Sequence, residues 1–286
     1  MLPITRTQTR GAPHPQAGAE SPRQPRPGRL ALALTLALLL PVGVEAAVQT
    51  EAVEYRDGEQ VLTGYLAYDD AVTGKRPGVL VAHEWWGLND YAKQRTQQLA
   101  QLGYVAFAAD LYGNHKVTTH AKDAEGWMKQ ITANAQAWQR RALAGLDALK
   151  ASDKVDGERL AAIGYCFGGS TVMQLAYAGA DLDGVVSFHG SLPPADAVAQ
   201  QRIKPSVLIA HGAKDPLVPP ERVAAFTAAL DAAGADWELA TYAGAEHAFT
   251  NPAADSFGIP GIKYDAKADA RSWALMQDFL REVFAR

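Results

Sequence analysis

The sequence predicts an α/β fold in which a mostly parallel central sheet carries helices on both faces. Short apolar runs, typical of buried parallel strands, recur along the chain, and segments of helical periodicity lie between them. Strand, helix and strand in repetition give such a layered sheet. The composition, 48% hydrophobic and 20% charged, is that of a globular protein with a sizeable core.

The expected strands begin with a hairpin over residues 53–68, in which Asp57 and Gly58 form the turn between alternating apolar positions. A later segment, 237–242, also has the character of a strand. Apolar runs predict the buried parallel strands between them, at residues 78–82, 104–108, 160–163, 184–188 and 207–210.

Helices are expected where large side chains recur at close to 3.6 residues, over residues 127–149 and again over 273–284. The chain has no internal repeat and no linker rich in Pro, Gly or Ser after residue 47. We therefore expect a single domain over residues 47–286. Ligands should meet it at the carboxyl ends of the strands, because helices cover both faces of the sheet.

The first 46 residues have the order of a secretory signal peptide. Residues 1–29 are rich in Arg, Pro and Gln, an eleven-residue apolar run follows over 30–40, and small residues lead to a cleavage point after Ala46. The apolar run has only about half of the roughly 20 residues that span a bilayer, so we expect no stable membrane insertion after cleavage. This predicts a periplasmic or secreted protein. An uncleaved anchor and a true start codon downstream of Met1 are the alternatives.

The charge is unevenly distributed. Residues 1–46 hold five arginines against two glutamates (5 − 2 = +3), so the remaining 240 residues carry −4 − 3 = −7. An acidic body repels phosphates, which argues against a nucleic-acid partner and an anionic membrane surface. Cys166 is the single cysteine, which excludes an intramolecular disulfide and a metal site built from cysteines.

Cys166 lies in the segment Ile-Gly-Tyr-Cys-Phe-Gly-Gly-Ser, where a buried strand is expected to end and a helix to begin. The pattern G-x-C-x-G-G is a nucleophile elbow with cysteine where serine is commoner. The flanking glycines let a strained turn form without collisions between Cβ atoms. The helix N-terminus favours a thiolate and offers N–H groups to an oxyanion. The alternative is a small buried hydrophobic residue in a glycine-rich turn.

Two further segments contain an acid and a base. Asp215 follows the expected strand 207–210, where a carboxylate can accept an imidazole N–H; a simple helix-entry turn is the alternative. His247 follows the segment 237–242, in the loop where a general base must lie. The order Cys166, Asp215 and His247, with gaps of 49 and 32 residues, is the chain order of α/β-hydrolases. We therefore expect an α/β-hydrolase fold.

The segment His-Glu-Trp-Trp-Gly-Leu-Asn, residues 83–89, follows the expected strand 78–82. In this architecture the loop after that strand provides one N–H of the oxyanion hole. We assign this N–H to Trp85 and pair it with the N–H of Phe167. Burial of the Glu84 carboxylate at the end of a buried strand costs free energy unless the carboxylate is paired or hydrogen-bonded. The alternative is that Glu84 lies at the surface.

Together the elbow, the acid loop, the histidine loop and segment 83–89 resemble the dienelactone hydrolase family over about residues 50–286. The resemblance implies a catalytic triad of Cys166, His247 and Asp215. It also implies that Glu84 contacts the resting thiol and helps to form the thiolate when substrate arrives. Members of the family hydrolyse enol-lactone and related ester bonds with neither a metal nor an organic cofactor.

One position departs from the pattern of this family. Members that cleave dienelactone hold the substrate carboxylate with arginines, one of them four residues after the catalytic histidine, where this chain has Asn251. Loss of a bidentate carboxylate clamp is not a conservative change. We expect Trp86, Phe249 and Asn251 to line the substrate pocket, with Trp85 adding to its apolar, aromatic character. A neutral ester or lactone therefore competes with dienelactone as the substrate.

The function expected from the sequence is hydrolysis of a small ester or lactone by a monomer, through a thioester on Cys166. A thiol-based redox protein is one alternative, although the chain has no second cysteine to resolve a sulfenic acid. A catalytically silent protein on the same scaffold is the other. Competent residue types at Cys166, Asp215, His247 and Glu84 argue against it.

Overall fold

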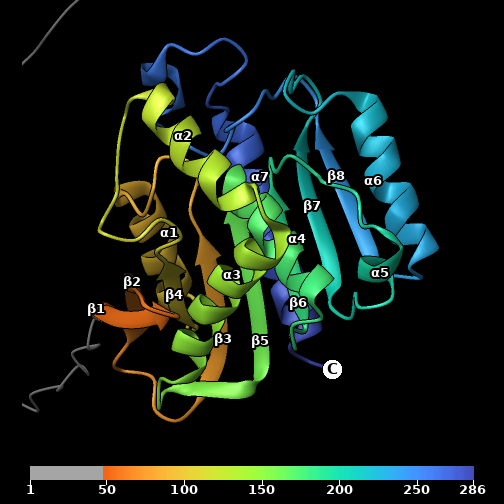
Figure 1. Ribbon diagram of the computed structural model, residues 1–286. Helices are drawn as coiled ribbons and strands as arrows, with labels where there is room; N and C mark the ends of the chain where they lie inside the picture. Colours follow the sequence, from red (N-terminus) through yellow and green to blue (C-terminus); the bar gives the residue numbers. More distant parts are fainter. Residues whose placement is uncertain (1–47) are drawn as a thin grey trace, which may run out of the picture. The chain divides into compact units, whose positions relative to one another are not determined.

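The computed structural model of this chain describes residues 48–286. The expected signal peptide and its cleavage point after Ala46 lie outside the described residues. Within residues 48–286 an eight-stranded sheet forms the centre of the molecule and helices flank it (Figure 1). None of the helices in this range has both the length and the apolar character needed to cross a membrane.

The sheet is mostly parallel. Its strand order is β1-β2-β4-β3-β5-β6-β7-β8, with β3 to β8 parallel to one another and the β1–β2 and β2–β4 pairs antiparallel. The strands are β1 (Val48–Asp57), β2 (Gln60–Asp69), β3 (Arg76–Ala82), β4 (Val105–Ala109), β5 (Val155–Tyr165), β6 (Gly184–Phe188), β7 (Ser206–Gly212) and β8 (Trp237–Tyr242). This architecture confirms the fold class that the sequence predicts.

Helices cover both faces of the sheet (Figure 1). One face carries α1 and α7, and the other carries α3, α4 and α6. The helices are α1 (Asp90–Gln101), α2 (Ala121–Thr132), α3 (Ala135–Lys150), α4 (Phe167–Ala178), α5 (Ala197–Gln200), α6 (Pro220–Ala232) and α7 (Ala266–Val283), with a short 3-10 helix, η1 (Ala254–Phe257).

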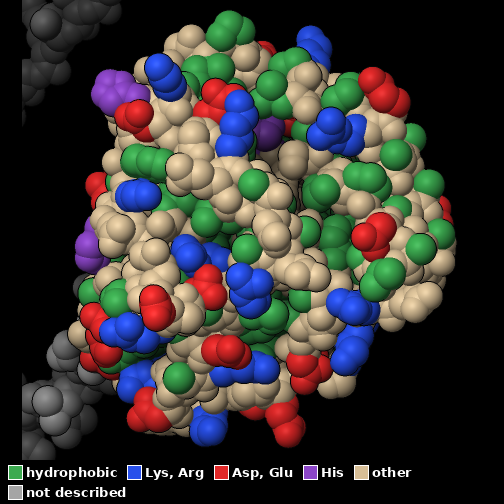
Figure 2. Space-filling view, in the orientation of Figure 1, with side chains coloured by type: hydrophobic (Ala, Val, Ile, Leu, Met, Phe, Trp, Pro, Cys, Tyr) green, Lys and Arg blue, Asp and Glu red, His purple; other side chains and the backbone are tan. Residues whose placement is uncertain are grey.

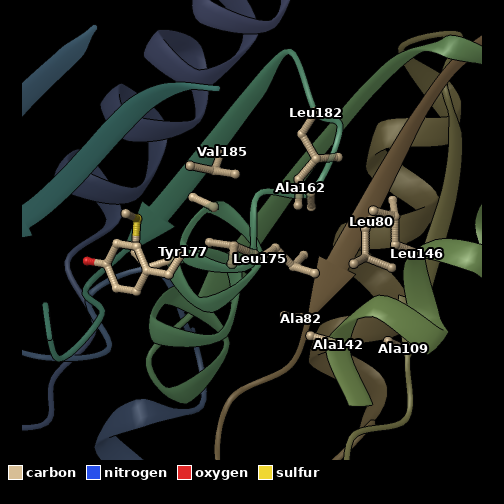
Figure 3. Packing of buried hydrophobic residues seen from close by; sticks show 14 of the residues in the cluster. Leu80, Ala82, Ala109, Ala142, Leu146, Ala162, Leu175, Tyr177, Leu182 and Val185 are labelled. Atoms are coloured by element: carbon tan, nitrogen blue, oxygen red, sulfur yellow. The ribbon is translucent and has the colours of Figure 1, made fainter. Parts of the chain in front are cut away.

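Each central strand contributes to two hydrophobic cores, because successive side chains point to opposite faces of a sheet. On β3, Leu80 and Ala82 belong to the core beneath α3 and α4, whereas Val79 and Val81 belong to the core beneath α1 and α7. Figure 3 shows the first of these cores, with Leu80 beside Leu146 of α3. Burial on both faces explains why these strands read as continuous apolar runs.

Two elements differ from the sequence-based expectation. The helix expected over 127–149 is two helices, because the side chain of Asn134 accepts the Ala137 N–H at 2.9 Å and begins α3 anew after α2 has ended. The hairpin expected over 53–68 is longer. Its cross-strand pairing runs from Val48 opposite Asp69 to the Asp57–Gln60 pair beside the turn.

Candidate active site

Cys166 occupies a sharp turn between the end of β5 and the first residue of α4. Its backbone has φ 54° and ψ −114°, a conformation that costs a residue with a side chain about 1–3 kcal/mol. The turn depends on glycine at two places. A Cβ at Gly164 would lie 2.0 Å from the carbonyl oxygen of Gly168, and one at Gly168 would lie 2.0 Å from that of Ala82. The half-buried thiol therefore stands at the N-terminus of a helix.

The strained turn is held by hydrogen bonds from the backbone N–H of Cys166. This N–H donates to the carbonyl oxygen of Phe188 at 3.0 Å and to Nδ1 of His189 at 3.1 Å. On its other side, Nε2 of His189 lies 2.7 Å from the hydroxyl oxygen of Thr250, which belongs to the loop that carries His247. The buried His189 ring thus connects the elbow with the histidine loop.

Asp215 and His247 form a buried pair. Nδ1 of His247 lies 2.7 Å from Oδ2 of Asp215, and both side chains are buried. Asp215 follows β7 and His247 follows β8, so neighbouring parallel strands bring them to one edge of the sheet. Because the Asp215 carboxylate bonds to Nδ1 of the ring, Nε2 remains available to other groups. Cys166 lines the same cavity as His247. The structure therefore brings all three residues of the expected triad together.

The surroundings of His247 favour its protonated form. Burial lowers the pKa of His247, but the charge of Cys166 and hydrogen bonds to Asp215 and Cys166 outweigh this and raise the pKa to about 10. An imidazolium held between a carboxylate and a sulfur can stabilise a thiolate and later return its proton.

Glu84 is buried beside this pair, and Asn251 is its partner. Nδ2 of Asn251 donates to Oε2 of Glu84 at 2.6 Å, and both side chains are almost fully buried. Burial raises the pKa of Glu84 to about 7, although the Asn251 hydrogen bond and the charges of His247 and Arg95 lower it. The expected contact from Glu84 to the resting thiol is not among the hydrogen bonds of residues 48–286.

A cavity of about 330 Å³ opens in front of Cys166 and His247. Its wall is mainly apolar. The residues that line it are Glu84, Trp85, Trp86, Met128, Thr132, Trp138, Cys166, Phe167, Ser170, Ser191, Pro193, Leu217, Val218, His247, Ala248 and Ile262. The Trp138 indole N–H donates to the Thr171 hydroxyl at 2.9 Å, so its polar edge is already satisfied. This space suits an uncharged group carried by a small molecule.

Two of the three residues expected to line the pocket do not line it. Trp86 is in the cavity wall, as expected, but Phe249 and Asn251 are not among the described residues that form it. Ala248 has φ 57°, and the Asn251 N–H donates to its carbonyl at 2.9 Å, so the chain turns inward directly after His247. Phe249 consequently packs against His189 and Tyr242, and Asn251 reaches Glu84.

The two residues expected to provide the oxyanion donors, Trp85 and Phe167, both line the cavity together with Cys166. Within residues 48–286, the backbone N–H of neither residue donates to another protein group. Both N–H groups are therefore free to bind a ligand oxygen.

Sequence reasoning missed several residues of the site. His189 follows the buried strand β6, and the rule that identified Asp215, a polar residue directly after a buried strand, could have found it. Met128 and Trp138 come from α2 and α3, and Ser170 and Ser191 form a hydroxyl pair 2.6 Å apart in the cavity wall. No local sequence pattern predicts that these residues line the cavity, because their position depends on how the helices pack over the ends of the strands.

We also searched the described residues for side chains that could bind a metal ion. The described part of the chain contains no group of three or more His, Cys, Asp or Glu side chains arranged to hold a metal ion.

Comparison with known proteins agrees with the geometry. The model of the "Dienelactone hydrolase family" matches residues 62–284. A putative carboxymethylenebutenolidase of Saccharolobus solfataricus is 28% identical over 72% of this chain and 89% of its own length. A probable 2-oxo-3-(5-oxofuran-2-ylidene)propanoate lactonase of Bradyrhizobium sp. is 30% identical over 74% and 89%. The crystal structure of a dienelactone hydrolase-like promiscuous phosphotriesterase from metagenomic libraries has 44% identity and a TM-score of 0.81, covering 83% of this chain and 99% of that one.

Proposed function

This chain belongs to the dienelactone hydrolase family, and we propose that it hydrolyses carboxylic ester or lactone bonds through a thioester on Cys166. The observation that carries the proposal is the pair of His247 and Asp215, with 2.7 Å between Nδ1 and Oδ2. His247 lines the same cavity as Cys166, the single cysteine of the chain. A nucleophile, a base and an acid that orients the base are the parts that acyl transfer needs.

In the first half of the reaction, Sγ of Cys166 attacks the carbonyl carbon of the ester. Negative charge develops on the carbonyl oxygen, and the N–H groups of Trp85 and Phe167 stabilise it. The tetrahedral intermediate collapses with cleavage of the bond to the alcohol oxygen. His247 donates its proton to that oxygen, so an alcohol leaves and the acyl group remains on Cys166 as a thioester.

In the second half, His247 is neutral and acts as the base. It removes a proton from a water molecule, whose oxygen attacks the thioester carbonyl while the same two N–H groups hold the oxyanion. Collapse releases a carboxylic acid and restores the thiolate beside protonated His247. Asp215 keeps the imidazole oriented throughout. Because a thiolate leaves more readily than an amide nitrogen, esters suit this nucleophile better than peptides.

The cavity supports a neutral, largely apolar substrate. Its wall contains no Lys or Arg among the described residues, and Asn251 is engaged with Glu84. We therefore propose neutral esters or lactones in preference to a dienelactone that carries a carboxylate. A phosphotriester is a second candidate, because the relative of 44% identity is described as a promiscuous phosphotriesterase and such a triester is also uncharged.

The decisive experiment is turnover of a short aryl ester, followed by mass spectrometry of the protein. We expect the native protein to hydrolyse 4-nitrophenyl butyrate and to gain the mass of one butyryl group on Cys166 when the reaction is quenched early. Cys166→Ala should lack both. Thr227→Ala, which removes a hydroxyl that bonds to the carbonyls of Val223 and Ala224 within α6 and does not line the cavity, should retain both. An acyl adduct on another residue, or full turnover by Cys166→Ala, would contradict the proposal.

We also propose that the mature protein begins at Ala47, is periplasmic or secreted and acts as a monomer on a small molecule, with neither a nucleic-acid nor a membrane partner. The support is the order of a positively charged region, an apolar run and small residues before Ala47. Intact-mass measurement of protein from the exported fraction of its native host tests this. We expect the mass of residues 47–286, and recovery of the mass with Met1 retained would refute cleavage.

A further inference from the structure

His83 holds a peptide group next to Cys166 in one orientation. The ring follows β3 and is completely buried, at 0% exposure. Its Nδ1 lies 2.5 Å from the carbonyl oxygen of Glu84, and the backbone N–H of Leu111 donates to its Nε2 at 3.2 Å. Both polar atoms of this ring are therefore engaged with the backbone of loops at the edge of the sheet.

These two contacts define the tautomer of His83. The Leu111 N–H needs an unprotonated nitrogen, so Nε2 is the acceptor, and a carbonyl oxygen only accepts, so Nδ1 carries the proton. Burial lowers the pKa of His83, which keeps the ring neutral. His83 is thus a fixed donor to the Glu84 carbonyl.

The direction of the Glu84 carbonyl determines the direction of the Trp85 N–H, because the C=O and N–H of a trans peptide point to opposite sides. The carbonyl accepts from His83 and also from the Gly87 N–H at 3.2 Å. The Trp85 N–H must therefore point away from both donors. The next peptide is held too, since the Tyr112 hydroxyl donates to the Trp85 carbonyl at 3.0 Å.

The loop after β3 is also in close contact with the elbow. A Cβ at Gly168 would come within 2.0 Å of the Ala82 carbonyl oxygen and 2.7 Å of that of His83. The His83 ring lies 6.1 Å from the Phe167 ring, centroid to centroid. The two N–H groups of the site, on Trp85 and Phe167, consequently belong to segments that touch each other.

We propose that His83 is a positioning residue: by donating Nδ1–H to the Glu84 carbonyl, it turns the Trp85 N–H toward the oxygen that becomes negative during acyl transfer. This inference rests on the proposed function, because only an acyl transfer develops that oxyanion. His83 touches neither the substrate nor the thiol in this role. It acts through the peptide between Glu84 and Trp85.

The test separates oxyanion stabilisation from reactivity of the thiol. His83→Phe keeps a ring but removes the donor. We expect kcat for 4-nitrophenyl butyrate to fall about 10²–10³-fold with KM little changed, as when an oxyanion donor is lost. Alkylation of Cys166 by iodoacetamide displaces iodide from a saturated carbon and develops no oxyanion, so its rate and pH profile should stay those of the native protein.

Two variants control for effects on folding. His120→Phe makes the same change at an exposed histidine and should leave both rates unchanged. His83→Asn returns an amide N–H near the position of Nδ1 and should recover part of kcat. If His83→Phe does not fold, His83→Met replaces it, because its thioether sulfur can accept weakly from the Leu111 N–H and the side chain has no N–H donor.

Ester turnover retained in the variant without the donor would overturn the inference, and so would an equal loss of ester turnover and alkylation. Either result leaves the proposed function intact as long as the native protein is active. A native protein that neither hydrolyses esters nor acylates Cys166 would instead refute the proposed function itself.

Discussion

At the scale of single residues, the unusual feature of this site is a buried carboxyl group with a neutral partner. Glu84 is 2% exposed, and the amide of Asn251 provides its one side-chain hydrogen bond in the described residues. An amide compensates for a buried negative charge less well than an arginine does. The neighbouring positive charge of His247 offsets part of the cost. The pKa of Glu84 therefore lies near neutrality.

The stability of the protein should depend on this carboxyl. Its folded-state pKa of about 7 lies above the ordinary 4.5, so its contribution to stability is present below pH 4.5 and is lost as the pH rises to 7. We expect Glu84→Gln to become progressively more stable than the native protein between pH 4.5 and 7, with no further change above pH 7. Urea unfolding across this range measures it. A difference that is constant with pH would argue against the raised pKa of Glu84.

At the scale of elements, the junction of β5 and α4 determines whether the thiol reaches the cavity. The end of β5 is buried and α4 begins at the residue after Cys166, so Cys166 alone must make the turn between them. Gly164 and Gly168 allow the backbone segments to approach each other, and the N–H of Cys166 is held from β6 and the residue after it. Neighbouring elements therefore maintain the strained φ of Cys166.

A methyl group at this junction should be strongly destabilising. Gly168→Ala would bring Cβ within 2.0 Å of the Ala82 carbonyl oxygen, which belongs to a central strand and has little room to move. We expect a loss of at least about 1–3 kcal/mol in the free energy of unfolding, the usual cost of overpacking, together with loss of ester turnover.

Gly126→Ala, in α2, is the matched control for this change. A Cβ at Gly126 meets nothing within 4 Å, so the same substitution should raise stability by about 0.5–1 kcal/mol. Chemical denaturation of both variants provides the comparison. Equal effects of the two substitutions would mean that the elbow is not closely packed.

At the scale of the whole molecule, the cavity is assembled from loops at one edge of the sheet and from α2, α3 and α4 above it. Its wall contains aromatic and aliphatic side chains but, within residues 48–286, no Lys or Arg. Figure 2 shows that charged side chains of both signs are dispersed over this face of the molecule. Apart from His247 of the proposed triad, the cavity wall thus provides no cationic side chain that could pair with an anionic group on a substrate.

Substrate charge should therefore decide turnover. 4-Nitrophenyl butyrate and 4-nitrophenyl hemisuccinate have the same leaving group, but the second has a carboxylate where the first has a methyl group. We expect kcat/KM to be at least about tenfold higher for the butyrate, because an unpaired buried carboxylate costs several kcal/mol. Reaction of both esters with a small free thiol corrects for intrinsic reactivity. A preference for the hemisuccinate would indicate a cationic contact that the cavity wall lacks.

The sequence predicted which candidate catalytic residues follow strands, because a strand that is buried on both faces has a continuous run of apolar residues. Glu84, Cys166 and Asp215 follow such strands. His247 follows β8, an edge strand that is only partly buried. The positions of Phe249 and Asn251 were wrong because one backbone angle, φ 57° at Ala248, turns the chain inward. His189 was missed although it follows the buried strand β6.

The sequence by itself determined the fold class and the order of the residues along it, since side-chain periodicity and glycine-flanked turns are local properties. Only the tertiary structure decided which side chains face the cavity, which partner Glu84 takes and which way the peptide before Trp85 points. These features depend on contacts between segments far apart in the chain, and such contacts are fixed by the packing of helices and loops over a common sheet edge.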